Sequence, residues 1–196
     1  MHGLINKGLQ GFLTDAYGEG VWYRIANAAR LRDGGFEAFL TYHPRLTRRV
    51  LAVAESFLGK PQDVLLEDLG SYLVASPKLE AFRRLLRFGG EDFSDFIQSL
   101  DELPERARLA VPDLVLPTIN IREPKPNEFE LICQSNFSGF CTILAGMLRA
   151  MADDYGTLSL IEWENRDDGS EVVFVRLLDG TYFEGREFDL AAGTAG

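Results

Sequence analysis

The chain has 196 residues, of which 46% are hydrophobic and 26% are charged, and its formal net charge is −10 at pH 7. This balance is typical of a water-soluble globular domain, and its acidity disfavours contact with phosphate backbones, so we expect no nucleic-acid partner. Because no apolar run approaches about 18 residues, we expect no membrane insertion and a cytoplasmic location.

The first half of the chain has the periodicity of amphipathic helices. Apolar residues recur at spacings of three and four, and glycine or proline residues separate the segments. The predicted helices cover residues 4–17, 21–31 and 44–58, and three more begin at Pro61, Pro77 and Phe93. The residues expected to face inward in the first and fourth of these helices are Leu4, Ile5, Leu9, Phe12, Leu13, Val64, Leu65, Leu69, Tyr72 and Leu73.

The helix that begins at Phe93 meets a proline. Its predicted buried stripe consists of Phe93, Phe96, Ile97, Leu100 and Leu103. The next position on that stripe is Pro104 or Ala107. Because proline lacks a backbone N–H and costs about 3 kcal/mol inside a helix, we expect Pro104 to lie in the first turn of a new helix.

The second half changes to the alternation that is typical of strands. The predicted elements are strands over 118–122 and 128–135, a turn over 123–127, a helix over 138–155, and a hairpin of strands over 157–164 and 171–178. The residues expected on the apolar face of that helix are Phe140, Ile143, Leu144, Met147 and Met151. We therefore predict an α+β fold, with a helical N-terminal lobe followed by a small antiparallel sheet of about four strands and a long helix.

The organisation that we predict is one domain over residues 1–190 and a flexible tail over residues 191–196. Within the domain, residues 1–111 form the mainly helical lobe and residues 112–190 form the α/β lobe. The tail DLAAGTAG is rich in small residues and has no apolar periodicity, so we expect it to be poorly ordered.

Side chains suited to catalysis are scarce. His2 and His43 are far apart in the sequence, and neither has a metal-ligating companion at helical spacing. No nucleophile, phosphate-binding or zinc-peptidase motif is present. Cys133 and Cys141 are too few for a disulfide framework or a zinc site, so we expect reduced thiols. We therefore predict a protein that is not an enzyme and has no metal site.

Several segments occur in an order that is typical of one known family. They are MHGLINKGLQGFL, AVAESFLGKPQDVLLEDLGSYLV, SLDELP, VPDLVLP and ELICQSNFSGFCTILAGMLRAM. Over residues 1–155 this order resembles that of the haem-nitric-oxide/oxygen-binding (H-NOX, or HNOB) domains. The resemblance implies the fold of those domains and a role in gas sensing and signalling.

The resemblance places Pro104 at the position of the iron ligand. In that family the segment that resembles SLDELP reads LDxLH, and its histidine is the proximal ligand of the haem iron. Proline has no imidazole and no free nitrogen lone pair, so it cannot coordinate iron. We therefore expect the standard ligation to be lost.

A second signature of the family is also changed. Relatives hold the haem propionates with YxSxR on a strand, and the matching residues here are Cys133, Ser135 and Phe137. A guanidinium forms a bidentate pair with a carboxylate, which neither phenylalanine nor cysteine can replace. Only Ser135 is retained, so we expect the propionate clamp to be lost as well.

The remaining pocket positions are largely apolar. By resemblance, Leu100 belongs to the pocket, Pro117 matches a proline that presses on the haem, and Ile5 and Leu73 lie on the distal side. Two side chains are candidate substitute ligands, His2 and Cys133, although each is also explained by an ordinary structural role. An empty cavity would cost roughly 20–25 cal/mol per Å³, so we expect apolar side chains such as that of Phe137 to refill it.

These features predict an H-NOX-like sensory or regulatory signalling protein that has lost standard haem ligation and acts through protein contact or another apolar ligand. The alternative is a haem-binding sensor of NO or O2 with a non-standard axial ligand. A third interpretation is an enzyme, or an accessory subunit of one, that uses a remaining cavity. Haem is the family's cofactor, but we expect none here. The resemblance implies a signalling partner in trans, a histidine kinase or a diguanylate cyclase.

Overall fold

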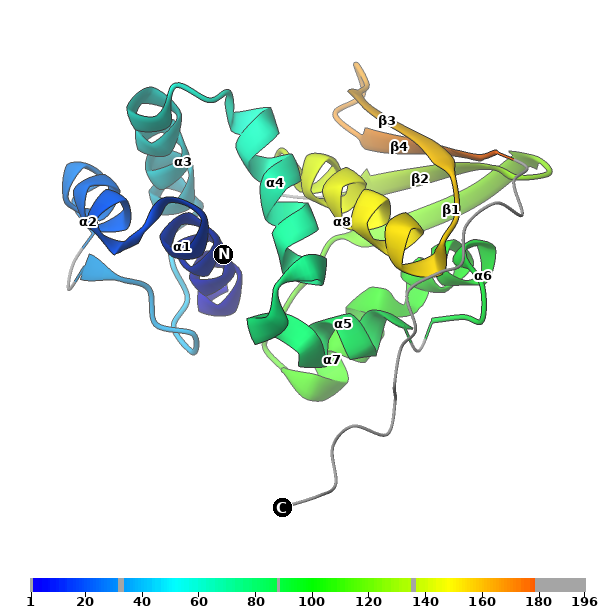
Figure 1. Cartoon of the computed structure of the whole chain (residues 1–196), viewed down its shortest axis with the longest axis horizontal. Helices are drawn as coiled ribbons and strands as arrows, with labels where there is room; N and C mark the ends of the chain where they lie inside the picture. Colours follow the sequence, from blue (N-terminus) through cyan, green and yellow to red (C-terminus); the bar gives the residue numbers. More distant parts are fainter. Residues whose placement is uncertain (1, 32–33, 88, 135–136, 179–196) are drawn as a thin grey trace.

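The computed structural model describes residues 2–31, 34–87, 89–134 and 137–178, and their fold is α+β, as predicted. The N-terminal lobe begins with helices α1 (Gly3–Tyr17), α2 (Glu19–Ala28), α3 (Pro44–Leu58) and α4 (Gln62–Ala75). Figure 1 shows α1, α2 and α3 at one end of the molecule, with α4 between them and the sheet.

Helix α3 has the bounds that the sequence predicts. Pro44 occupies the first turn, where its missing N–H has no intrahelical partner to lose. Gly59 follows the helix with a φ of 65°, and its N–H donates to the Glu55 carbonyl. This left-handed position closes the helix and favours glycine because glycine has no Cβ.

The chain then forms a series of short helical segments. They are η2 (Pro77–Leu79), α5 (Glu80–Arg87), α6 (Phe93–Gln98), η3 (Ser99–Glu102) and α7 (Leu103–Ala110), where η denotes a 3-10 helix. The predicted buried stripe is confirmed, because Phe93, Phe96, Ile97, Leu100 and Leu103 are each at most 3% exposed.

The described part of the second half forms one antiparallel sheet with strand order β1-β2-β4-β3. Its strands are β1 (Thr118–Lys125), β2 (Glu128–Gln134), β3 (Ser159–Asn165) and β4 (Glu171–Leu177). The predicted turn over 123–127 is wrong at its start, since β1 continues to Lys125. A register shift after Arg122 lets Lys125 pair with Glu128 and so prolongs the strand.

Helix α8 (Phe140–Tyr155) lies between α4 and the sheet (Figure 1). The prediction of a single apolar face was too narrow. Residues all around the helix are buried, including Cys141, Ile143, Ala145, Leu148 and Ala152. A helix that is covered on two sides must be apolar on both, and this arrangement makes α8 the centre of the core.

Two glycines allow α4 and α8 to cross with their backbones in contact. A Cβ on Gly70 would overlap the Ile143 carbonyl oxygen, and a Cβ on Gly146 would overlap the Glu67 carbonyl oxygen. The Ser71 hydroxyl donates to the Gly146 carbonyl at 3.2 Å. The crossing therefore joins the helical lobe to the sheet lobe at a distance that only glycine permits.

A buried ion pair ties α5 to the end of α8. The Arg83 guanidinium donates to both carboxylate oxygens of Asp154, at 2.5 and 2.7 Å. The Asp154 side chain is 4% exposed. Next to this pair the Arg87 guanidinium lies 4.0 Å from the centre of the Tyr155 ring. Such a bidentate geometry fixes orientation as well as supplying energy.

Some predicted helix faces differ from those observed. Leu4 is 41% exposed and Val64 is 43% exposed, so neither faces the core as predicted. Both stand in the first turn of their helix. Helix α2 ends at Ala28, three residues before the predicted end at Leu31.

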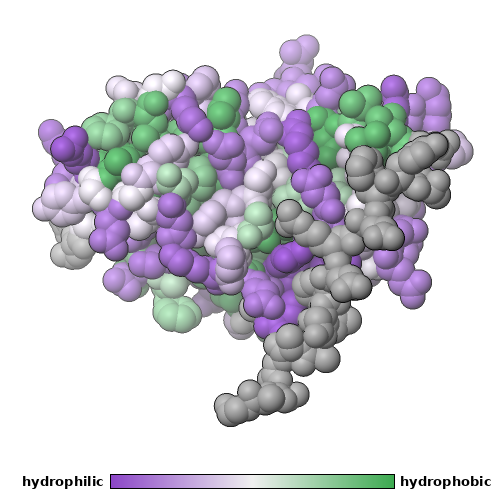
Figure 2. Space-filling view, in the orientation of Figure 1, coloured by the Kyte–Doolittle hydropathy of each residue, from purple (hydrophilic) through white to green (hydrophobic). Residues whose placement is uncertain are grey.

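The surface in view is mainly polar. Figure 2 shows hydrophobic residues gathered at two separate places, over α2 and α3 and beside β3, with hydrophilic residues between them. No helix in the described residues is long and apolar enough to span a bilayer. The predicted domain end at residue 190 and the tail over 191–196 lie outside the described residues.

Replacing Gly70 or Gly146 by alanine is expected to destabilise the protein by about 1–3 kcal/mol, because the added methyl group forces the two helices apart. Gly20→Ala in α2 is the matched control, since a Cβ there meets no atom within 4 Å. Urea unfolding followed by circular dichroism measures the three variants. A Gly70→Ala protein as stable as the unchanged chain would contradict the close crossing.

Asp154→Ala is expected to lower the free energy of unfolding by about 3–5 kcal/mol, because it leaves the partly buried Arg83 without its carboxylate. The neighbouring Asp153 is exposed and forms no side-chain ion pair among the described residues, so Asp153→Ala serves as the control. Equal unfolding midpoints for the two variants would show that the ion pair does not hold α5 in place.

Candidate functional site

Pro104 interrupts the helix at the position predicted for iron ligation. It is buried in the first turn of α7, as expected. Because Pro104 has no N–H, the Leu100 carbonyl accepts instead from the Leu103 N–H, three residues on. This shorter spacing is that of a 3-10 helix, and it accounts for η3 between α6 and α7.

An arginine side chain stabilises this interruption. The Arg106 guanidinium reaches back from α7 and donates to the Ser99 carbonyl at 2.7 Å and to the Ser99 hydroxyl oxygen at 3.2 Å. The Ser99 hydroxyl in turn donates to the Phe96 carbonyl at 2.8 Å. Side chains of Arg106 and Ser99 thus donate to backbone carbonyls at the interruption. These hydrogen bonds stabilise the interrupted helix.

The described residues at the positions of the propionate clamp face the core. Cys133 lies in β2, is 1% exposed, and its thiol donates weakly to the Leu131 carbonyl at 3.9 Å. Phe137 follows β2, is half-buried, and packs against the main core. Ser135 lies outside the described residues. Neither described residue offers a cation or a strong donor to a carboxylate.

A buried carboxylate next to Cys133 was missed by the sequence analysis. Glu171 pairs with Cys133 across the strands β4 and β2 and is 7% exposed. Its two oxygens accept from the N–H groups of Gly139 and Cys141, at 2.6 and 2.9 Å. Glu171 therefore caps the N-terminus of α8, where backbone donors and the helix dipole favour an anion.

The two cysteines lie close together beneath this cap. Both are free and buried, as predicted for reduced thiols. A hydrogen bond to Cys133 raises the pKa of the Cys141 thiol, and burial raises it further. A thiol with a raised pKa is a poor thiolate ligand for iron or zinc at neutral pH.

The predicted distal residues lie in the other lobe. Ile5 in α1 and Leu73 in α4 are both half-buried. A Cβ on Gly8 would lie 3.5 Å from the Leu73 methyl carbon, so α1 and α4 pack closely here. Pro117 is half-buried just before β1. Leu100 and Cys133 are almost fully buried members of the main core, as is Ile119.

Both histidines cap helices. The His2 Nδ1 accepts from the Leu4 N–H at 3.1 Å, and the His43 Nδ1 accepts from the Arg45 N–H at 3.2 Å. His2 also forms a backbone bridge with Thr41. Within the described residues, no group of three or more His, Cys, Asp or Glu side chains is arranged to hold a metal ion.

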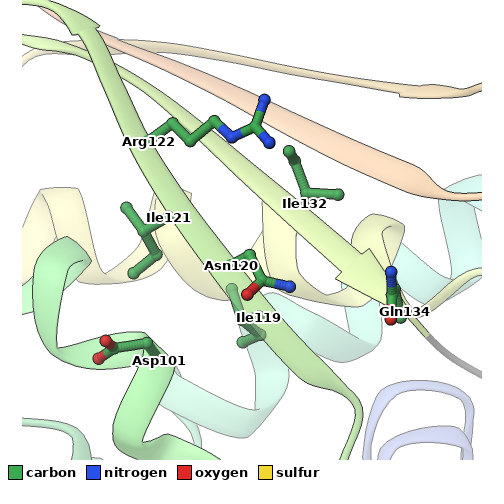
Figure 3. A pocket seen from close by; sticks show the side chains of 7 residues that line it. All are labelled: Asp101, Ile119, Asn120, Ile121, Arg122, Ile132 and Gln134. Carbon is green, nitrogen blue, oxygen red and sulfur yellow. The ribbon is translucent and has the colours of Figure 1, made fainter.

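A hollow of about 400 Å³ lies elsewhere, beside the edge strand β1 (Figure 3). It is lined by Asp101, Ile119, Asn120, Ile121, Arg122, Ile132 and Gln134. None of the predicted pocket positions among the described residues lines it. The hollow lies at the sheet, and its lining includes the sequence neighbours of Leu100 and Cys133, namely Asp101, Ile132 and Gln134.

Comparison with known proteins agrees with the fold. The family model for Haem-NO-binding proteins matches residues 2–162. Soluble guanylate cyclase 89Da of Drosophila melanogaster is 21% identical over 92% of this chain and 28% of that protein. Soluble guanylate cyclase gcy-31 of Caenorhabditis elegans is 25% identical over 79% of this chain and 22% of that protein. The chain thus spans less than a third of these relatives' length.

Comparison with solved structures also agrees with the fold. The Fe(II) unliganded H-NOX protein from K. algicida superposes with a TM-score of 0.79 and 21% identity, covering 94% of this chain and 100% of that one. A mutant H-NOX protein from S. oneidensis in the Fe(II) state gives a TM-score of 0.78 and 16% identity, covering 93% and 98%. These likenesses confirm the predicted fold.

We expect Cys141 to resist alkylation in the folded protein, because its thiol is buried in the core and out of reach of the reagent. In a Cys133→Ser variant, which leaves one cysteine, iodoacetamide should modify Cys141 far more slowly without urea than with it. Mass spectrometry over time gives both rates. Similar rates, with circular dichroism showing a folded variant, would contradict the buried position of the thiol.

Proposed function

This chain belongs to the Haem-NO-binding (H-NOX) family, and we propose that it is a regulatory member that has lost standard haem ligation and acts through protein contact. The observation that carries this proposal is the buried Pro104 in the first turn of α7. Haem iron in proteins is held by imidazole, thiolate, thioether or phenolate side chains, and proline has none of these groups.

The surroundings of Pro104 support the proposal. Leu100 is fully buried and Leu103 is 3% exposed, so protein atoms already occupy the space around them. The 3-10 segment η3 also interrupts the helix that would carry an axial ligand.

The side chains at the propionate positions also support the proposed loss of haem ligation. A haem places two propionates where basic or hydroxyl side chains can hold them, but Cys133 and Phe137 supply neither. Glu171 already gives a carboxylate to the N-terminus of α8. A second carboxylate brought near this buried anion would meet like-charge repulsion.

The two candidate substitute ligands have other roles. The Nδ1 of His2 accepts the first-turn N–H of α1, and releasing it would cost about 1 kcal/mol of capping energy. Cys133 is packed against Cys141 in the core. The alternative function, a gas sensor with a non-standard axial ligand, requires one of these side chains to leave its present partner.

We further propose that the partner is a signalling protein in trans and that this chain does not catalyse a reaction. The named relatives are soluble guanylate cyclases that are more than three times as long as the matching segment. A scaffold of this family without an iron ligand retains one means of signalling, which is a surface that another protein recognises.

The absorbance spectrum tests this proposal. The chain is expressed with added haem precursor, beside the K. algicida H-NOX protein as a positive control, and we expect no stoichiometric Soret band from the purified chain. The band would be present for the control, because that protein is described with Fe(II).

A stoichiometric Soret band would overturn the proposal. In that case, His2→Ala and Cys133→Ala variants identify the ligand, since removing the axial ligand shifts the band. A band that neither substitution shifts would exclude both residues as ligands.

A further inference from the structure

Helix α3 carries a row of side chains that changes from charged to apolar along its length. Residues four apart on a helix form a continuous ridge, and one ridge of α3 consists of Arg45, Arg49, Val53 and Phe57. The two arginines are exposed, Val53 is half-buried, and Phe57 is 45% exposed. Arg48, which lies beside this row, is also exposed. We call these five residues the α3 ridge.

The arginines of the α3 ridge have no carboxylate partner. No ion pair within the described residues involves Arg45, Arg48 or Arg49. Glu55, the acidic residue of α3, accepts instead from the Gln62 amide at 2.5 Å. The chain has 30 acidic and 20 basic residues, and lysines and arginines of other elements do form ion pairs. The positive charge of the α3 ridge is therefore left uncompensated.

This arrangement of charge destabilises the helix in the isolated chain. Like charges three or four residues apart on a helix repel each other, and Arg45 has an arginine at both spacings. Arg45 also stands in the first turn of α3, where the helix dipole disfavours a cation and where no acidic residue is present. A carboxylate supplied by another molecule would relieve both effects, so these positions favour an acidic ligand.

The apolar end of the α3 ridge meets helix α2. The Arg24 guanidinium, from α2, lies 6.0 Å from the centre of the Phe57 ring, which is a cation–π contact. Arg24 is exposed and forms no ion pair in the part of the chain that the structure describes. Figure 2 shows hydrophobic residues gathered over α2 and α3. An exposed ring beside a cation suits a ligand that is both apolar and acidic.

The size of this surface favours a short segment of protein over a long polyanion. At 1.5 Å per residue, the stretch of α3 from Arg45 to Phe57 is about 18 Å long. Since the net charge of the chain is −10 and the α3 ridge is positive, the rest of the chain is more acidic still. A nucleic acid or an anionic bilayer extends beyond the ridge and would be repelled by these other charges, whereas one helix covers the ridge and ends there.

We propose that the α3 ridge binds an acidic amphipathic helix of the partner signalling protein. Two apolar residues of that helix, four positions apart, contact Val53 and Phe57. Carboxylates one and two turns further along the helix pair with Arg49 and Arg45. Helices that bind to protein surfaces commonly anchor themselves through residues at this spacing, and charge complementarity sets their orientation. This inference names the kind of partner for the regulatory role proposed above and rests on it.

The test uses the full chain labelled with nitrogen-15 and three capped helical peptides of equal length. The first peptide has two leucines four positions apart, followed one and two turns later by glutamates. The second has lysine in place of glutamate, and the third has serine in place of leucine. We expect the first peptide to shift the amide signals of Val53 and Phe57 and to bind about tenfold more tightly than either control. The absorbance of the same sample at the Soret position reports separately on haem.

Variants locate the binding surface. Arg45→Glu combined with Arg49→Glu should weaken binding of the first peptide about tenfold and strengthen binding of the lysine peptide. Arg108→Glu combined with Arg122→Glu is the matched control, because it changes the net charge equally at exposed positions of α7 and β1. It should leave the affinity within about twofold of the unchanged chain at physiological salt. Phe57→Ala should weaken the first peptide about fivefold and leave the serine peptide unaffected. Circular dichroism establishes that all variants are folded.

Four outcomes would overturn the proposal. They are no amide shift in α3 with the first peptide, equal weakening by the two double variants, tighter binding of a duplex DNA fragment than of the first peptide, and sedimentation of the chain with phosphatidylserine vesicles. The third outcome would assign the α3 ridge to nucleic acid, and the fourth would assign it to a membrane surface. A Soret band together with selective peptide binding would remove only the proposed loss of haem. The absence of both would remove only this inference.

Discussion

The contact between α4 and α8 is the constraint on which the rest of the structure depends. Because Gly70 and Gly146 lack side chains, the backbones of the two helices touch, and α8 can be covered by α4 on one side and by the sheet on the other. This close crossing leaves little freedom for relative movement of the lobes, since packed backbones are far less deformable than side chains. The positions of η3 and β1 follow, because both are held against the core that α8 organises.

The same packing accounts for the changes at the expected haem position. Pro104 removes the donor for the Leu100 carbonyl, the chain tightens into η3, and Arg106 satisfies the Ser99 carbonyl that is left over. Each step supplies a partner for a backbone group that a continuous helix would have paired. The interruption is therefore paired by groups of the chain itself, and η3 presents Asp101 beside β1.

Local signals in the sequence predicted most of the fold, and long-range pairings accounted for what was missed. Pro44 and Gly59 predicted both ends of α3, because proline and glycine have intrinsic preferences at helix ends. The cap formed by Glu171 was not predictable in this way, since its partners are about 30 residues away and meet it only through strand register. The place of β1 at the end of the strand order likewise depends on the pairing of all four strands.

Glu171 has a consequence for the biosynthesis of the protein. The anion that completes this end of α8 is part of the polypeptide, so it is present as soon as the chain leaves the ribosome. The helix end can then form without any prosthetic group.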